Sequence, residues 1–165
     1  MKITLKNVKY AKFASEETPC FSATVYANGE KIGFANNSGT GGETTIRPDN
    51  AVSRDDLNVI DAALKAEDVR PGPDAEDFER EMYDKGYRNG LEDAVMRALD
   101  DYLAVRDLKR LLARKALAVV DGKLLAYSGK PMPALYVAIA TKEPDAKILN
   151  ILPFDEALAL YRKYG

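Results

Sequence analysis

The sequence predicts an α+β protein, in which β-rich segments at both ends of the chain flank a helical middle. Apolar and polar residues alternate from Met1 to Lys6, and this period of two indicates a strand. Between 53 and 115, apolar residues recur at spacings of three and four, which indicates helices. Asn-Gly at 28–29 and Asp-Gly at 121–122 each lie between apolar runs, and both dipeptides are typical of β-hairpin turns.

The first part of the chain, residues 1–52, is predicted to be β-rich. The run CFSATVYA precedes Asn28-Gly29, and EKIGFA follows it. We expect a hairpin with a type I′ turn here, because both central residues of that turn need positive φ. A short further strand is expected at TTI, residues 44–46.

Residues 53–115 are predicted to be helical. Ser53 with Asp56 three residues later is a variant of the capping box, so we expect a helix to begin there. The Pro-Gly-Pro stretch at 71–73 breaks the pattern. A second helix, with Phe78 and Met82 one turn apart, is expected up to the glycines near 86–90, and a third from about 91 to 114.

The last part, residues 116–165, is predicted to be a β-meander followed by a C-terminal helix. A hairpin is expected around 121–122, and ALYVAIATK is expected to be a central strand because it is apolar on both faces. KILNIL is expected to be one more strand, and Pro153 to open the final helix. We expect one mixed or antiparallel sheet packed with helices, in a single domain of 165 residues.

The composition excludes several classes of chemistry. The chain has no histidine and no tryptophan, and Cys20 is its one cysteine. Catalysis by Ser-His-Asp or Cys-His groups and histidine-containing zinc sites are therefore excluded. Carboxylates, lysines, tyrosines, hydroxyls and backbone amides remain as catalytic material, so an enzyme that works with carboxylates alone stays a third alternative. We expect a protein that is not an enzyme, with no catalytic residues, no metal and no cofactor.

Charge and hydropathy indicate a soluble cytoplasmic protein. The single cysteine excludes an internal disulfide, which favours a reducing compartment. The longest apolar run, at 134–140, has seven residues, far short of the ~20 that a membrane helix needs. We expect no secretory signal and no membrane partner. The net charge of −2 argues against direct binding of nucleic acid.

Charge is segregated along the chain. Residues 53–101 contain 7 basic and 15 acidic side chains, net −8, whereas 1–52 carry +1 and 102–165 carry +5. One interpretation is a solvated helix face. The other is a docking surface for a basic partner, with carboxylates in place of nucleic-acid phosphates. No acidic triplet has the alternation of a calcium loop. The candidate partner-binding residues are Asp74, Glu76, Asp77, Glu79, Glu81 and Asp84.

The stretch ANNSGTGGETT, residues 35–45, is rich in glycine. The nucleotide-binding loop pattern needs lysine after its last glycine, but Glu43 follows here and would repel phosphate. A flexible connector and a looser nest of backbone amides that binds an anion both remain open. The candidate ligand-binding residues of this stretch are Asn37, Gly39, Gly41 and Gly42.

Three basic residues, Arg106, Lys109 and Arg110, are spaced to share one face of the third helix. Ion pairing within the helix is one interpretation, and contact with phosphate is the other. Combined with the glycine stretch, the second interpretation gives an alternative function, a protein that binds or sequesters a nucleotide.

Two segments carry a resemblance to a known group of proteins. The opening MKITLKNVK, followed by SEET and the hairpin within residues 1–33, and DLKRLLARK within 100–117 resemble small proteins of tailed bacteriophages and prophages. The resemblance implies an accessory phage protein that acts inside a bacterial cell. Such proteins often bind and block a host machine, including restriction and CRISPR systems.

We therefore expect a non-enzymatic phage-type accessory protein. Through its acidic helical face it would bind and inhibit a host defence protein, as an anti-CRISPR does, or another protein that handles nucleic acid.

Overall fold

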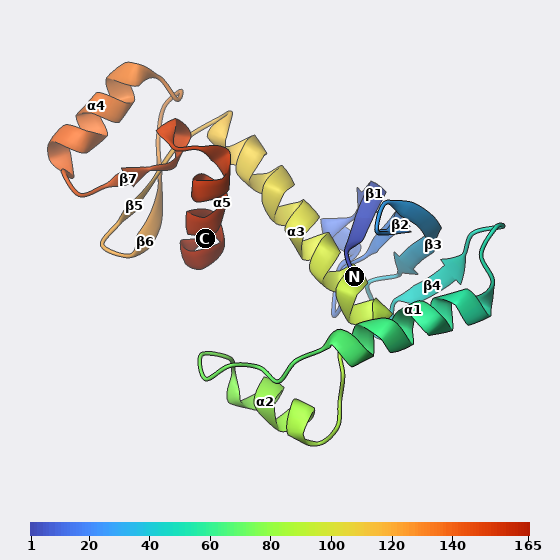
Figure 1. The fold of residues 1–165 in the computed structure, drawn as a ribbon. Coiled ribbons are helices and arrows are strands. Elements are labelled where there is room, and N and C mark those ends of the chain that lie inside the picture. The colour runs from blue at the N-terminus through green and yellow to red at the C-terminus, as the bar shows by residue number, and fades with distance from the viewer. The chain divides into compact units, whose positions relative to one another are not determined.

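The computed structural model describes residues 1–165 and confirms the predicted α+β class (Figure 1). The chain forms two compact units, residues 1–99 and residues 100–165, and each is described by itself. The prediction of a single domain stays a prediction. None of the helices combines the length and the apolar character that a membrane span requires.

The first unit contains a four-stranded antiparallel sheet with its strands in chain order. Its strands are β1 (Ile3–Tyr10), β2 (Phe21–Ala27), β3 (Glu30–Asn37) and β4 (Thr45–Pro48). The predicted hairpin joins β2 to β3. Asn28 has φ 48° and Gly29 has φ 91°, which are the two positive values that the turn requires.

Three helices begin in the first unit: α1 (Arg54–Glu67), α2 (Asp77–Asp84) and α3 (Leu91–Leu112). The capping box at the start of α1 is confirmed, because Ser53 accepts the Asp56 amide and Asp56 accepts the Ser53 amide. The core of this unit buries apolar residues of β2 and of the helices. Among them are Phe21, Val25, Leu57, Val95 and Leu99.

The second unit contains a three-stranded antiparallel sheet in the order β6-β5-β7. Its elements are β5 (Ala116–Val120), β6 (Lys123–Tyr127), α4 (Pro133–Lys142), β7 (Lys147–Ile148) and α5 (Phe154–Tyr164). The Asp121-Gly122 turn between β5 and β6 is confirmed, with φ values of 48° and 72°. Strand β5 is central and buried on both faces. Leu117 and Val119 belong to a core cluster that packs with residues of α5, and Ala116 and Ala118 to a cluster with Ile139 of α4.

The expected central strand at ALYVAIATK is wrong, because these residues form α4. Pro133 stands in the first turn of the helix, where its missing amide is tolerated, and the alanines that follow favour a helix. Ile139 is the one fully buried residue of α4, so the segment is not sandwiched as a central strand would be.

The predicted meander and the single sheet are also wrong. KILNIL forms only two residues of strand before the 3₁₀ turn η2 (Leu149–Ile151). In that turn the Asn150 side chain accepts the Leu117 amide and donates to the carbonyl oxygens of Leu112 and Lys115, at 2.7–3.1 Å. Two sheets form instead of one because the strands of the second unit bury their apolar residues against helices of that unit.

Candidate functional site

The six candidate acidic residues lie on α2 and on the loop before it, and all six are exposed. Three of them are paired with basic residues of the same segment: Asp77 with Arg80, Glu81 with Lys85, and Asp84 with Arg70. The other three make no ion pair or side-chain hydrogen bond. These unpaired carboxylates are Asp74, Glu76 and Glu79.

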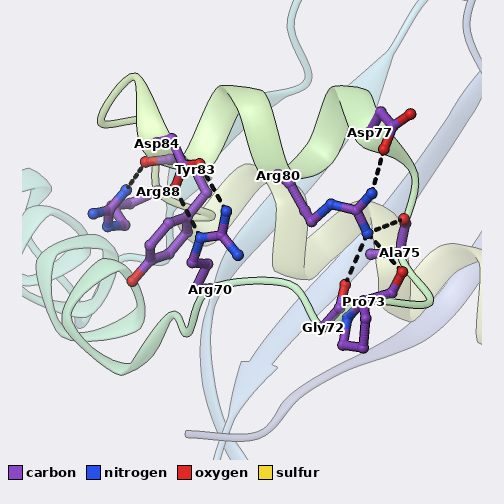
Figure 2. Close-up of polar contacts among 9 residues, drawn as sticks. All are labelled: Arg70, Gly72, Pro73, Ala75, Asp77, Arg80, Tyr83, Asp84 and Arg88. Carbon is purple, nitrogen blue, oxygen red and sulfur yellow. Dashed lines mark hydrogen bonds and ion pairs between the residues drawn. The ribbon is translucent and has the colours of Figure 1, made fainter.

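Arg80 fixes the loop before α2 to the helix. Its Nη1 donates to the carbonyl oxygens of Gly72, Pro73 and Ala75 at 3.3, 2.6 and 2.9 Å, and its Nη2 donates to Asp77 (Figure 2). One planar guanidinium therefore satisfies three loop carbonyls and a carboxylate. Of the unpaired carboxylates, Glu79 consequently stands on a short helix, and Asp74 and Glu76 stand on the loop that Arg80 fixes to that helix.

The end of α2 is held by two further arginines (Figure 2). Arg70 donates from Nε and Nη2 to the two carboxylate oxygens of Asp84, both at 2.8 Å. These bonds hold the pKa of Asp84 below its ordinary value. Arg88 lies 3.6 Å from the centre of the Tyr83 ring and donates to the Tyr83 carbonyl at 2.7 Å. Both contacts are of the kind that proteins use to recognise arginine.

A pocket of about 490 Å³ opens beside α2. Its apolar wall includes Phe78, Met82, Tyr83 and Tyr87. The Phe78 side chain is 66% exposed, although it stands one turn from Met82 in what the sequence indicated to be an apolar stripe. An aromatic ring this exposed on an acidic helix is a candidate contact for a partner.

Two of the pocket's carboxylates are held by neutral donors. Tyr87 Oη donates to Asp93 at 2.8 Å, and this bond raises the pKa of Tyr87 to about 12. Asp68 accepts the Asn89 amide at 2.9 Å. Burial acts to raise the pKa of Asp68, but the hydrogen bonds from Asn89 and the charge of Arg97 outweigh it, and the pKa is lowered. The Asp68 carboxylate thus keeps its charge at neutral pH.

The pocket was not predicted from the sequence. Its residues come from the end of α1, from α2 and from the start of α3, so only the fold brings them together. The one signal in the sequence was the group of aromatic residues at 78, 83 and 87 within the acidic segment. Of the six predicted acidic residues, Glu79 alone lines the pocket.

The glycine stretch follows β3 and is organised by the Asn37 side chain. Its Oδ1 accepts the Gly39 amide and the Thr18 hydroxyl, both at 2.8 Å, and its Nδ2 donates to the Gly42 carbonyl at 3.2 Å. The Gly41 amide donates to Thr18 Oγ1 at 3.3 Å. Two of the three glycine amides are therefore engaged within the protein.

The same stretch is docked on residues 11–20. The Gly39 carbonyl accepts the amides of Glu16 and Glu17 at 2.9 and 3.0 Å. A Cβ at Gly41 would lie 2.4 Å from Oε2 of Glu17, so a carboxylate lies against the glycines. This geometry favours a structured connecting loop over a phosphate-binding loop.

The three basic candidates belong to the second unit, whereas the glycine stretch belongs to the first. Arg106 Nε donates to Asp107 at 2.8 Å, and Arg110 lies 4.0 Å from the same carboxylate. Lys109 Nζ lies 5.4 Å from the centre of the Phe154 ring. Ion pairing within the helix accounts for two of the three, and the nucleotide-binding alternative stays a prediction.

The chain contains no group of three acidic or cysteine side chains arranged to hold a metal ion. Comparison of the chain with protein-family models, with curated proteins and with solved structures finds no match.

Proposed function

We propose that this chain is a non-enzymatic binding protein whose acidic α2 surface docks on a basic surface of another protein. The observation that carries the proposal is that Asp74, Glu76 and Glu79 lie within four residues of Phe78 in the sequence. Three exposed carboxylates without partners in the protein and an exposed aromatic ring therefore belong to one short segment. An interface anchored by an aromatic side chain and rimmed by charge is typical of specific protein binding.

The charge pattern supports a partner that handles nucleic acid. Three of the four basic side chains in residues 70–88 are paired with acidic neighbours. The unpaired carboxylates therefore dominate the charge that this segment exposes to a partner. Such a surface attracts a positively charged groove over a distance and competes for it with phosphates. The proposed mechanism is therefore occupation of a nucleic-acid-binding surface.

The partner we propose is a defence protein of a bacterial host, acting in restriction or in CRISPR immunity. This step is supported by the resemblance of residues 1–33 and 100–117 to small proteins of tailed phages and prophages. On this proposal the protein acts in the host cytoplasm, where it would shield incoming phage DNA.

The test uses a triple variant, Asp74→Lys, Glu76→Lys and Glu79→Lys. Its control, Glu16→Lys, Glu30→Lys and Glu43→Lys, changes net charge equally at exposed acidic residues of the same unit. Each protein is expressed in a bacterium that carries a defined restriction or CRISPR system, and the plating efficiency of a sensitive phage is measured. We expect the wild type and the control to raise plating efficiency, and the α2 variant to lose that effect.

Glu79 lies in the first turn of α2, where removing an acidic residue costs about 0.3–1 kcal/mol, so circular dichroism must show that the variant is folded. Equal protection by a folded α2 variant and by the wild type would exclude α2 as the docking surface. No protection by any of the three proteins against restriction and CRISPR systems would exclude the proposed partner class.

A further inference from the structure

We propose that the pocket beside α2 receives an arginine side chain of the partner protein, with its guanidinium group against Phe78 and Glu79. The inference rests on the proposed function and names the chemistry of the contact at its centre.

The pocket is large enough to admit an arginine side chain, and its walls suit one. The pocket volume is about 490 Å³, more than one long side chain fills, and the pocket opens at the surface beside α2. Phe78 is 66% exposed and Tyr87 is 46% exposed, so both present aromatic surface to a ligand. A guanidinium group is planar and weakly hydrated, and it stacks on such rings.

The charge of the pocket selects a cation. Three carboxylates and one guanidinium, that of Arg97, line it, which gives a net charge of −2. Asp68 and Asp93 accept hydrogen bonds from the neutral donors Asn89, Tyr87 and Gly90. Arg97 is the one cation in the lining and acts on Asp68, so two of the three negative charges remain uncompensated. A phosphate or carboxylate ligand would face net repulsion.

Glu79 is the pocket carboxylate that remains free to form an ion pair. Its side chain has no partner in the protein, and it follows Phe78 directly in α2. A guanidinium group can make both contacts at once: it donates hydrogen bonds to the Glu79 carboxylate and stacks its plane against the Phe78 ring.

The same segment already binds arginine in both ways (Figure 2). Arg70 makes two parallel bonds of 2.8 Å to Asp84, and Arg88 stacks on Tyr83 at 3.6 Å. A lysine ammonium can make neither the parallel pair of bonds nor the planar stack. The structure therefore assigns arginine rather than lysine to the pocket.

The test is an NMR titration of the full chain with N-acetyl-arginine amide. The matched probe N-acetyl-citrulline amide has nearly the same shape but no charge, and N-acetyl-lysine amide has charge but no planar group. We expect the arginine probe to shift signals of Phe78, Met82 and Tyr87, with the two other probes binding about two- to fivefold more weakly.

The variants Glu79→Gln and Phe78→Ala should each weaken binding of the arginine probe about two- to fivefold, since each removes one exposed contact. Glu81→Gln is the control, because Glu81 is exposed on the same helix but is paired with Lys85 and does not line the pocket. It should leave binding unchanged.

Equal binding of all three probes, or shifts that avoid the pocket, would overturn the assignment. Equal binding of the lysine probe alone would overturn the choice of arginine. If the arginine probe does not bind in the pocket but the α2 triple variant loses protection, the pocket assignment is rejected and the docking surface is supported. If the arginine probe binds in the pocket but that variant protects fully, the pocket assignment is supported and the docking surface is rejected.

Discussion

Alanine substitution at the three glycines after β3 should destabilise the protein in a graded series. At Gly42, φ is 87° and a Cβ would meet nothing within 4 Å. The substitution therefore costs only backbone strain, about 1–3 kcal/mol. About 0.4–1 kcal/mol of this is offset because alanine restricts the unfolded chain.

Gly39 should be far less tolerant. Its φ is 90°, and a Cβ there would lie 2.0 Å from the carbonyl oxygen of Ala14 and 2.7 Å from Cβ of Cys20. Relieving that collision moves the Gly39 carbonyl away from the amides of Glu16 and Glu17, which it now accepts at 2.9 and 3.0 Å. Each lost hydrogen bond contributes about 0.5–1.5 kcal/mol. We expect Gly39→Ala to cost about 1–3 kcal/mol more than Gly42→Ala, the sum for the two bonds.

Gly41 should fall between the two, because the atom that its Cβ would meet is the carboxylate end of Glu17, which can rotate away. Urea unfolding followed by circular dichroism measures the series, with Gly72→Ala as the control. Gly72 is exposed, has no positive φ and has open space around it, so alanine should be tolerated there. Equal losses at Gly39 and Gly42 would show that residues 11–20 do not hold this stretch.

Three further predictions concern hydrogen bonds within each of the two units. Ser53→Ala should lower the free energy of unfolding by about 1 kcal/mol in urea titrations, because it removes the cap of α1; no loss would contradict the observed capping box. The raised pKa of Tyr87 stabilises the fold below about pH 10, and this contribution should be lost as pH rises toward about 12. In Asp93→Asn, NMR titration should show the Tyr87 pKa closer to its ordinary value of 10.0; an unchanged pKa would exclude their hydrogen bond as the cause. Asn150→Ala should cost about 1–3 kcal/mol, because it leaves the buried Leu117 amide without its acceptor; a change within measurement error in thermal unfolding would refute this.

Local signals predicted most of the fold. The turn at Asn28-Gly29 and the cap at Ser53 depend on residues adjacent in sequence, so their chemistry can be read without the rest of the chain. The apolar run at 134–142 has no period that separates a strand from a helix. Its outcome depends on Pro133 and on which strand occupies the centre of the sheet, and that position is taken by β5.

The candidate site was predictable only in part. Exposure of the acidic residues follows from composition, but their pairing does not. Arg70 meets Asp84 across fourteen residues, and only the fold decides that Glu79 is left without a partner. The pocket needs Asp68 and Asn89 to meet across 21 residues, and no periodicity encodes that approach.

Native mass spectrometry of the tagged protein, purified gently from a host with an active defence system, tests the docking surface most directly. For the wild type and for the Glu16, Glu30 and Glu43 control, we expect the added mass of a protein partner. For the Asp74, Glu76 and Glu79 variant, we expect the bare chain. The same complex in all three samples, or the bare chain in all three, would contradict it.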